Sequence, residues 1–85
     1  MTHHKLPEVE KRLARIEGHV KGIRKMIDDG KSYPEIVQQI TAVRAALDGA
    51  LGVIVEDLVE GINQAPHGKR RQATTELKDT VSKIL

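Results

Sequence analysis

Apolar residues recur at helical spacing along most of the chain, and the longest such segment runs from Ser32 to Ile62. One apolar stripe continues through it for about seven turns, at about 3.6 residues per turn. The residues of the stripe are Ile36, Ile40, Val43, Leu47, Leu51, Ile54, Leu58 and Ile62. This pattern predicts a single long helix over residues 33–63.

The start of this segment has the residues of a helix N-terminus. Ser32 and Glu35 form a Ser-x-x-Glu capping box. Pro34 stands in the first turn, where a backbone amide would have no intrahelical hydrogen bond to lose. The middle of the segment is rich in small residues, which let helix axes approach closely. We therefore expect the tightest helix crossing at Ala42, Ala45, Ala46, Gly49, Ala50 and Gly52.

A second apolar pattern precedes the first and predicts a helix over residues 7–29. Its positions alternate at spacings of four and three: Val9, Leu13, Ile16, Val20, Ile23 and Ile27. Gly30 is the expected left-handed residue after the helix. Gly18 and Gly22 each cost about 1 kcal/mol relative to alanine in a helix interior. Close approach of another backbone would explain both glycines, and simple helix weakness is the alternative.

A breaker-rich turn at residues 63–68 leads to a third apolar pattern, formed by Ala73, Leu77, Val81 and Ile84. It predicts a short helix over residues 69–84, which would be marginal alone and needs a surface to dock on. The expected architecture is a single all-α domain of residues 1–85 with three helices.

The long stripe predicts self-association. The flanking segments are too short to cover it, and the chain of 85 residues has no Phe or Trp and one Tyr with which to enlarge its core. Two antiparallel hairpins of the first two helices, packed as a four-helix-bundle dimer, are the simplest way to cover it.

Composition excludes several classes of protein. The chain has no Cys, so neither a disulfide nor a thiolate metal site is available. Charged residues make up 31% of it, no apolar run approaches the roughly 18 residues of a membrane span, and no apolar leader is visible. We expect a cytoplasmic protein. No phosphate loop, zinc-protease motif or nucleophile elbow is present, so we do not expect an enzyme.

Four histidines raise the question of a metal site. No two of them stand three or four residues apart, so none forms a chelating pair on a helix. Each is expected to be a surface or packing residue, although a site assembled between subunits stays open. The four are His3, His4, His19 and His67.

Basic residues gather at two places. Arg12 and Arg15 lie on the first predicted helix, and Lys69, Arg70 and Arg71 begin the third. One interpretation is that these basic residues only keep the surface soluble. The other is a positive field, repeated by symmetry in an oligomer, that suits the phosphate backbone of DNA. No helix-turn-helix pattern accompanies these residues.

Two stretches, residues 12–23 (RLARIEGHVKGI) and 38–47 (QQITAVRAAL), resemble the copper-sensing operon repressor family, which includes nickel/cobalt-sensing and formaldehyde-sensing repressors. The resemblance spans about Val9 to Val81. It implies a homodimer of antiparallel hairpins, which in the family is usually paired into a homotetramer; the residues of this chain leave the choice between homodimer and homotetramer open. It also implies operator binding, with release when an effector occupies a site between subunits. The positions that match the family's basic residues are Arg12, Arg15 and Arg44.

This chain differs from that family at the positions of the effector site. Aligned on Gln39 and Ile40, its Cys, His and Cys positions are Tyr33, Leu58 and Ile62, so no copper-type metal site and no cofactor are expected. The nickel/cobalt branch also recruits an N-terminal histidine, which His3 or His4 could mimic.

These features predict a DNA-binding transcriptional repressor whose effector is not a metal bound by thiolates. Two alternatives remain open. One is a structural module or a member that hetero-oligomerises with a metal-binding relative. The other is a sensor with a rebuilt site that uses His3, His4, His19 or Tyr33.

Overall fold

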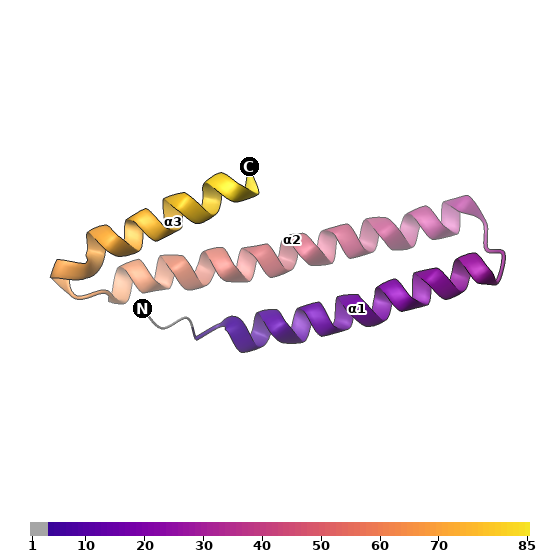
Figure 1. Ribbon diagram of the computed structural model, residues 1–85, viewed down its shortest axis with the longest axis horizontal. Helices are drawn as coiled ribbons and strands as arrows, with labels where there is room; N and C mark the ends of the chain where they lie inside the picture. The colour runs from indigo at the N-terminus through magenta and orange to yellow at the C-terminus, as the bar shows by residue number, and fades with distance from the viewer. Residues whose placement is uncertain (1–3) are drawn as a thin grey trace.

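The computed structural model describes residues 4–85, so His3 lies outside the described residues. It contains three α-helices and a 3-10 turn, and no strand among the described residues (Figure 1). The elements are α1 (Leu6–Asp28), α2 (Tyr33–Gln64), η1 (His67–Lys69) and α3 (Arg70–Ile84). The all-α prediction is confirmed, and each helix boundary lies within one residue of its expected position.

The chain between α1 and α2 turns sharply because both helix ends are capped. Gly30 is left-handed, with φ of 75°. The amide of Gly30 donates to Ile27 O, and the amide of Lys31 donates to Met26 O, as in a Schellman motif. The predicted capping box is present, since the Glu35 amide donates to Ser32 Oγ (3.4 Å) and the Ser32 amide donates to Glu35 Oε2 (3.1 Å). These caps make α1 and α2 an antiparallel hairpin.

The three helices form one layer with α2 in the middle (Figure 1). α2 packs against both α1 and α3, whereas α1 and α3 do not pack on each other within the described residues. The principal extents are 58 × 24 × 13 Å, so the layer is about one helix thick. The radius of gyration is 17.3 Å, against about 12 Å for a compact domain of this length. The protomer therefore has little interior.

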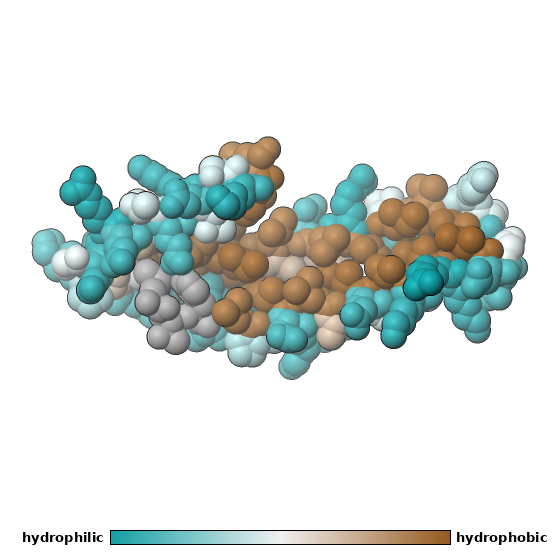
Figure 2. Space-filling view, in the orientation of Figure 1, coloured by the Kyte–Doolittle hydropathy of each residue, from teal (hydrophilic) through white to brown (hydrophobic). Residues whose placement is uncertain are grey.

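Only half of the apolar pattern of α1 is buried in the hairpin. Val9, Ile16 and Ile23 are buried against α2, while the intervening apolar residues remain exposed. Figure 2 shows apolar side chains in a band along α1 and α2. We call the exposed part of this band the apolar face; it consists of Leu13, Val20, Ile27, Ile40, Leu47 and Leu51, which recur at helical spacing on α1 and α2.

The glycines of α1 have open space beside them. A Cβ added at Gly18 or Gly22 would meet nothing within 4 Å among the described residues, so no backbone of the same chain explains these two residues, and a second copy or simple helix weakness remains as the explanation. Gly49 instead has a close neighbour, because its Cβ position lies 3.2 Å from Arg12 Nη1. At this point of the small-residue segment, α2 accommodates a long side chain of α1.

α3 docks on α2 through Ala73, which is almost fully buried. The predicted requirement for a docking surface is met by α2 alone in the protomer. No helix within residues 4–85 is both long and apolar enough to cross a membrane.

Candidate functional site

Arg12 and Arg15 lie together where α1 meets α2. They line a shallow hollow with Ile16, His19 and Ala46, and a second hollow with Pro7, Glu8 and Lys11. Arg12 is half-buried, with Nη2 3.8 Å from Glu8 Oε1. Its Nε is buried without a hydrogen-bond partner among the described residues. The guanidinium is thus held against α2 at one end and open to a further acceptor.

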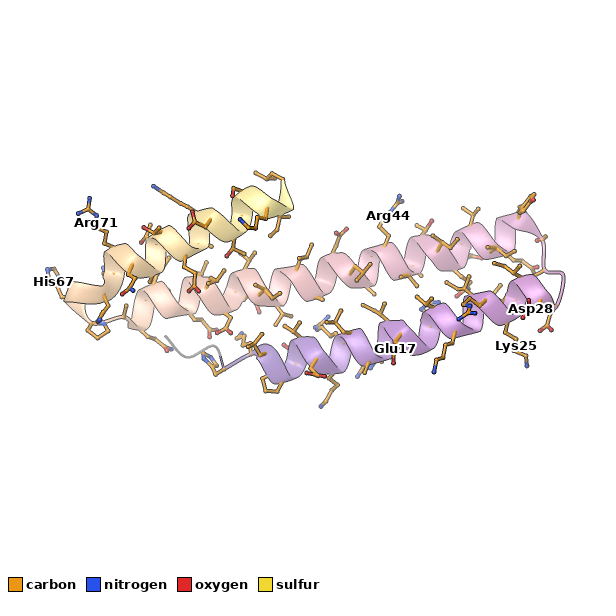
Figure 3. The ribbon with its side chains drawn as sticks, viewed as in Figure 1. Glu17, Lys25, Asp28, Arg44, His67 and Arg71 are labelled. Carbon is orange, nitrogen blue, oxygen red and sulfur yellow. The ribbon has the colours of Figure 1, made fainter. Side chains whose placement is uncertain are left out.

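The other expected cations lie elsewhere. Arg44 projects from α2 on the side away from α1, and Arg71 projects from α3 (Figure 3). Lys69 ends η1, and Arg70 and Arg71 begin α3, so the three stand at the corner between α2 and α3, where all are exposed. One protomer therefore brings Arg12 and Arg15 together but does not join them to Arg44 or to the corner.

The positions that correspond to the family's effector site do not form a site within one chain. Tyr33 begins α2, whereas Leu58 and Ile62 lie near its end, about 38 and about 44 Å along the helix at 1.5 Å per residue. Tyr33 is 84% exposed and Leu58 only 4% exposed. A buried aliphatic side chain offers no ligand atom, so these residues do not fit a metal ion.

A cluster that the sequence analysis missed lies where the N-terminus of α1 meets the end of α2. His4 Nε2 is 3.0 Å from Glu60 Oε2, and His4 Nδ1 is 3.5 Å from Asp57 Oδ1. One ligand atom from each of these three residues lies within 4.8 Å of the others. Asp57 is only 5% exposed, and its Oδ2 accepts the backbone amide of Lys5 at 3.1 Å.

Lys5 joins the same cluster through its ammonium. Its Nζ lies 3.1 Å from Glu60 Oε1 and 3.3 Å from Glu56 Oε2. These hydrogen bonds raise the pKa of Lys5, first through Glu60 and then through Glu56. The bond from Lys5 likewise lowers the pKa of Glu60. We call Lys5, Glu56 and the three residues above the His4 cluster.

The remaining described histidines have other surroundings. His19 Nε2 donates to Gln39 Oε1 at 2.7 Å and so links α1 to α2. His67 is exposed in η1 and points away from the helices (Figure 3).

Asp57 is a carboxylate that the sequence analysis did not single out, and it is buried. The antiparallel hairpin sets the residues before α1 beside the last turns of α2, which brings His4 to Asp57 and Glu60. The signal in the sequence was a pair of carboxylates three residues apart within the long apolar pattern, opposite an N-terminal histidine. Spacing rules for histidine pairs on one helix do not detect it.

Residues 6–83 match the model of a protein family described as metal-sensitive transcriptional repressor. The chain is 33% identical over 79 residues to the copper-sensing transcriptional repressor CsoR of Bacillus subtilis, covering 91% of this chain and 78% of that protein. It is 29% identical over 79 residues to the transcriptional repressor RcnR of Salmonella typhimurium, covering 92% and 84%.

A solved structure is also similar over its whole length. The nickel-responsive transcriptional regulator InrS superposes with a TM-score of 0.83 at 32% identity, covering 100% of this chain and 98% of that one. The three-helix layer with its long central helix is therefore shared with a regulator of known structure.

Proposed function

Because the chain belongs to the family of metal-sensitive transcriptional repressors, we propose that it binds operator DNA and represses transcription in the cytoplasm. The family consists of regulators and not of enzymes. The observation that carries the proposal is the match to the family model over residues 6–83, together with the pair Arg12 and Arg15 on a rigid helix.

The arginine pair suits a phosphate backbone. Arg12 is already ordered by Glu8 and by its contact at Gly49, so little side-chain entropy is lost when a phosphate binds. The buried Nε of Arg12 has no acceptor in the described part of the chain, and a guanidinium binds phosphate oxygens with directed hydrogen bonds. Arg44 and residues 69–71 are further proposed contacts, but they lie on other faces of the protomer. They reach the same DNA as Arg12 and Arg15 only if a second copy supplies them.

The proposed active species is a homo-oligomer. The apolar face runs along both α1 and α2 and has no cover in a layer one helix thick. A second hairpin packed against it gives the four-helix bundle and repeats Arg12 and Arg15 by symmetry. A dimer of such dimers repeats them again.

The proposed repressor does not sense copper through thiolates. Tyr33, Leu58 and Ile62 stand at the corresponding positions, and none of them is a soft-metal ligand. The proposed repressor therefore has the scaffold of the family without the thiolate ligands of a copper sensor.

Fluorescence anisotropy with a labelled duplex from upstream of the gene tests the proposal. We expect tight binding at low salt, with an affinity that falls linearly on a logarithmic salt scale. Binding that is absent at low salt, or that does not depend on salt, contradicts the proposal. In that case, co-purification of a second family member would favour a hetero-oligomeric module.

Replacing one arginine of the pair tests its role. Arg12→Ala should weaken DNA binding about equally for all sequences and reduce the salt slope by about 1, because one phosphate contact is lost. Lys83→Ala is the matched control, since it removes a charge from the last turn of α3. An unchanged slope in Arg12→Ala, with the helical circular dichroism preserved, removes Arg12 from the contact surface.

A further inference from the structure

We propose that His4, Asp57 and Glu60 form a binding site for a borderline divalent transition metal ion of the Zn²⁺, Co²⁺ or Ni²⁺ type. The site lies within one protomer, where the segment before α1 crosses the last turns of α2. It shares no residue with Tyr33, Leu58 and Ile62. The proposal concerns metal binding alone and does not depend on whether the chain binds DNA.

The ligand set determines the kind of ion. One imidazole nitrogen and two carboxylate oxygens suit borderline divalent ions and offer nothing to Cu(I), which prefers thiolate and thioether sulfur. The three ligand atoms lie within 4.8 Å of one another, and ligands of one ion with bonds of about 2.1 Å lie about 3 to 4 Å apart. A shift of about 1 Å closes the site. His4 and Glu60 are exposed enough to make that shift.

Asp57 supports a cation at this place more strongly than an exposed carboxylate would. It is a buried carboxylate, and among the described residues it has no lysine or arginine within ion-pair distance. Its partners are the backbone amide of Lys5 and the imidazole of His4, which carries a charge only when protonated. A buried carboxylate without a full positive partner is costly, and a bound divalent ion removes that cost.

The net charge around the proposed site is negative, which also favours binding of a cation. Glu56, Asp57 and Glu60 contribute three negative charges, and within residues 4–85 the ammonium of Lys5 is the single fixed positive charge among their ion pairs. Two negative charges therefore remain when His4 is neutral, which matches a divalent cation. Lys5 competes with the ion for Glu60, because its Nζ lies 3.1 Å from Glu60 Oε1.

The backbone beside His4 is held before any ion binds, while the imidazole remains free to adjust. The amide of Lys5 donates to Asp57, so the backbone next to His4 is tied to α2 independently of the imidazole. The cluster thus joins residues far apart in sequence through a backbone bond, and the ion would add bonds between the same two segments. Bound metal would fasten the start of α1, the helix that carries Arg12 and Arg15, to the end of α2.

Titration of the metal-free full chain with Co²⁺, followed by its visible absorption and by competition with Zn²⁺, tests the site. We expect one ion per chain. His4→Gln and Glu60→Gln should each weaken binding at least tenfold, since each removes a ligand. Asp57 is left unchanged, because replacing this buried residue could unfold the protein and so would not test metal binding alone.

Three further variants make the result specific. Lys5→Met should strengthen binding severalfold, because it removes the competing ammonium and leaves the backbone amide in place. His3→Gln and His67→Gln are matched controls that should leave the affinity within about twofold. Circular dichroism and thermal melting check that every variant is folded.

The outcomes decide the proposal. Loss of affinity in His4→Gln and Glu60→Gln together with a gain in Lys5→Met supports it. Absence of Co²⁺ and Zn²⁺ binding, or equal affinity in the wild type and in His4→Gln, overturns it. Loss in His3→Gln with none in His4→Gln also overturns it and assigns the ion to the extreme N-terminus. Binding of Mg²⁺ as tight as that of Co²⁺ would show that the imidazole is not a ligand.

Discussion

The guanidinium of Arg12 lies over a glycine of the neighbouring helix. Gly49 leaves room for it, and the position of a Cβ there is 3.2 Å from Arg12 Nη1. A glycine inside a helix is unfavourable by about 1 kcal/mol relative to alanine, so its presence in α2 is explained by this contact and not by helix formation. Arg12 and Gly49 are therefore expected to act as a pair.

Gly49→Ala separates stability from DNA binding at this position. The alanine should stabilise the protein by up to about 1 kcal/mol through helix propensity, while its Cβ pushes the flexible end of Arg12 aside by a few tenths of an ångström. We expect a higher melting temperature and weaker DNA binding, measured by thermal melting and anisotropy.

Gly22→Ala is the control for this prediction, because its Cβ meets nothing within 4 Å in residues 4–85. It should raise the melting temperature without changing DNA affinity. Equal DNA affinity in both alanine variants would show that the position of Arg12 over Gly49 has no role in binding.

Among single residues, those with local causes could be predicted and those with distant causes could not. Gly30 and the Ser32–Glu35 pair follow from helix-end chemistry within a few positions of the chain. The surroundings of Asp57 did not, because the backbone amide that donates to it belongs to Lys5, which is 52 positions away in sequence. A contact of that kind appears only when the register of the hairpin is known.

The helices followed from the sequence because apolar spacing and end caps agree along each of them. The apolar spacing could not show which half of the pattern is buried inside the protomer. Val9, Ile16 and Ile23 face α2, while Leu13 and Val20 remain exposed, although all five fit one helical pattern. The angle at which α1 crosses α2 determines which of these residues are buried, and that angle depends on the side chains of both helices.

The capping box of α2 makes the stability of this helix depend on pH. The amide and then the hydroxyl of Ser32 donate to the Glu35 carboxylate, which lowers the pKa of Glu35 below its ordinary value of 4.5. A carboxyl with a lowered pKa in the folded state stabilises the protein above the ordinary value. That stabilisation is lost as the pH falls through the lowered pKa.

Glu35→Gln tests this dependence. The variant should melt below the wild type at neutral pH, and the difference should shrink as the pH falls below about 4.5. Thermal melting followed by circular dichroism over that range measures it. Glu17→Gln, which removes the same charge from an exposed position on α1, controls for the loss of one negative charge. A difference that stays constant with pH would show that the Ser32–Glu35 bonds do not depend on the ionised carboxylate.

For the whole molecule, the apolar face is the feature with the largest energetic consequence. It leaves large aliphatic side chains in water along both α1 and α2 (Figure 2). Burying such a side chain is favourable by about 1.5 to 3 kcal/mol, so a second copy that covers the face would contribute more than any contact inside the protomer. The sequence predicted this requirement because the stripe is longer than its own flanks can cover.

A charge placed in the apolar face should prevent self-association. Ile40 is 52% exposed in the protomer and lies on α2, so Ile40→Glu introduces a carboxylate where the second copy would pack. We expect a monomer with reduced helicity and no DNA binding, measured by sedimentation and circular dichroism. Gln38→Glu adds the same charge at an exposed polar position two residues away and should keep the oligomer. An oligomer of unchanged size in Ile40→Glu would mean that another surface holds the copies together.

The 13 Å thickness of the layer has a consequence for the life of the protein in the cell. A chain with so little interior gains most of its stability from meeting another copy, so the folded fraction rises with the number of chains present. We therefore expect unpaired chains to be cleaved by proteases more readily than paired ones, so that scarce chains are removed faster than abundant ones. Synthesis of this protein would then have a threshold, below which turnover keeps its level low and above which it accumulates.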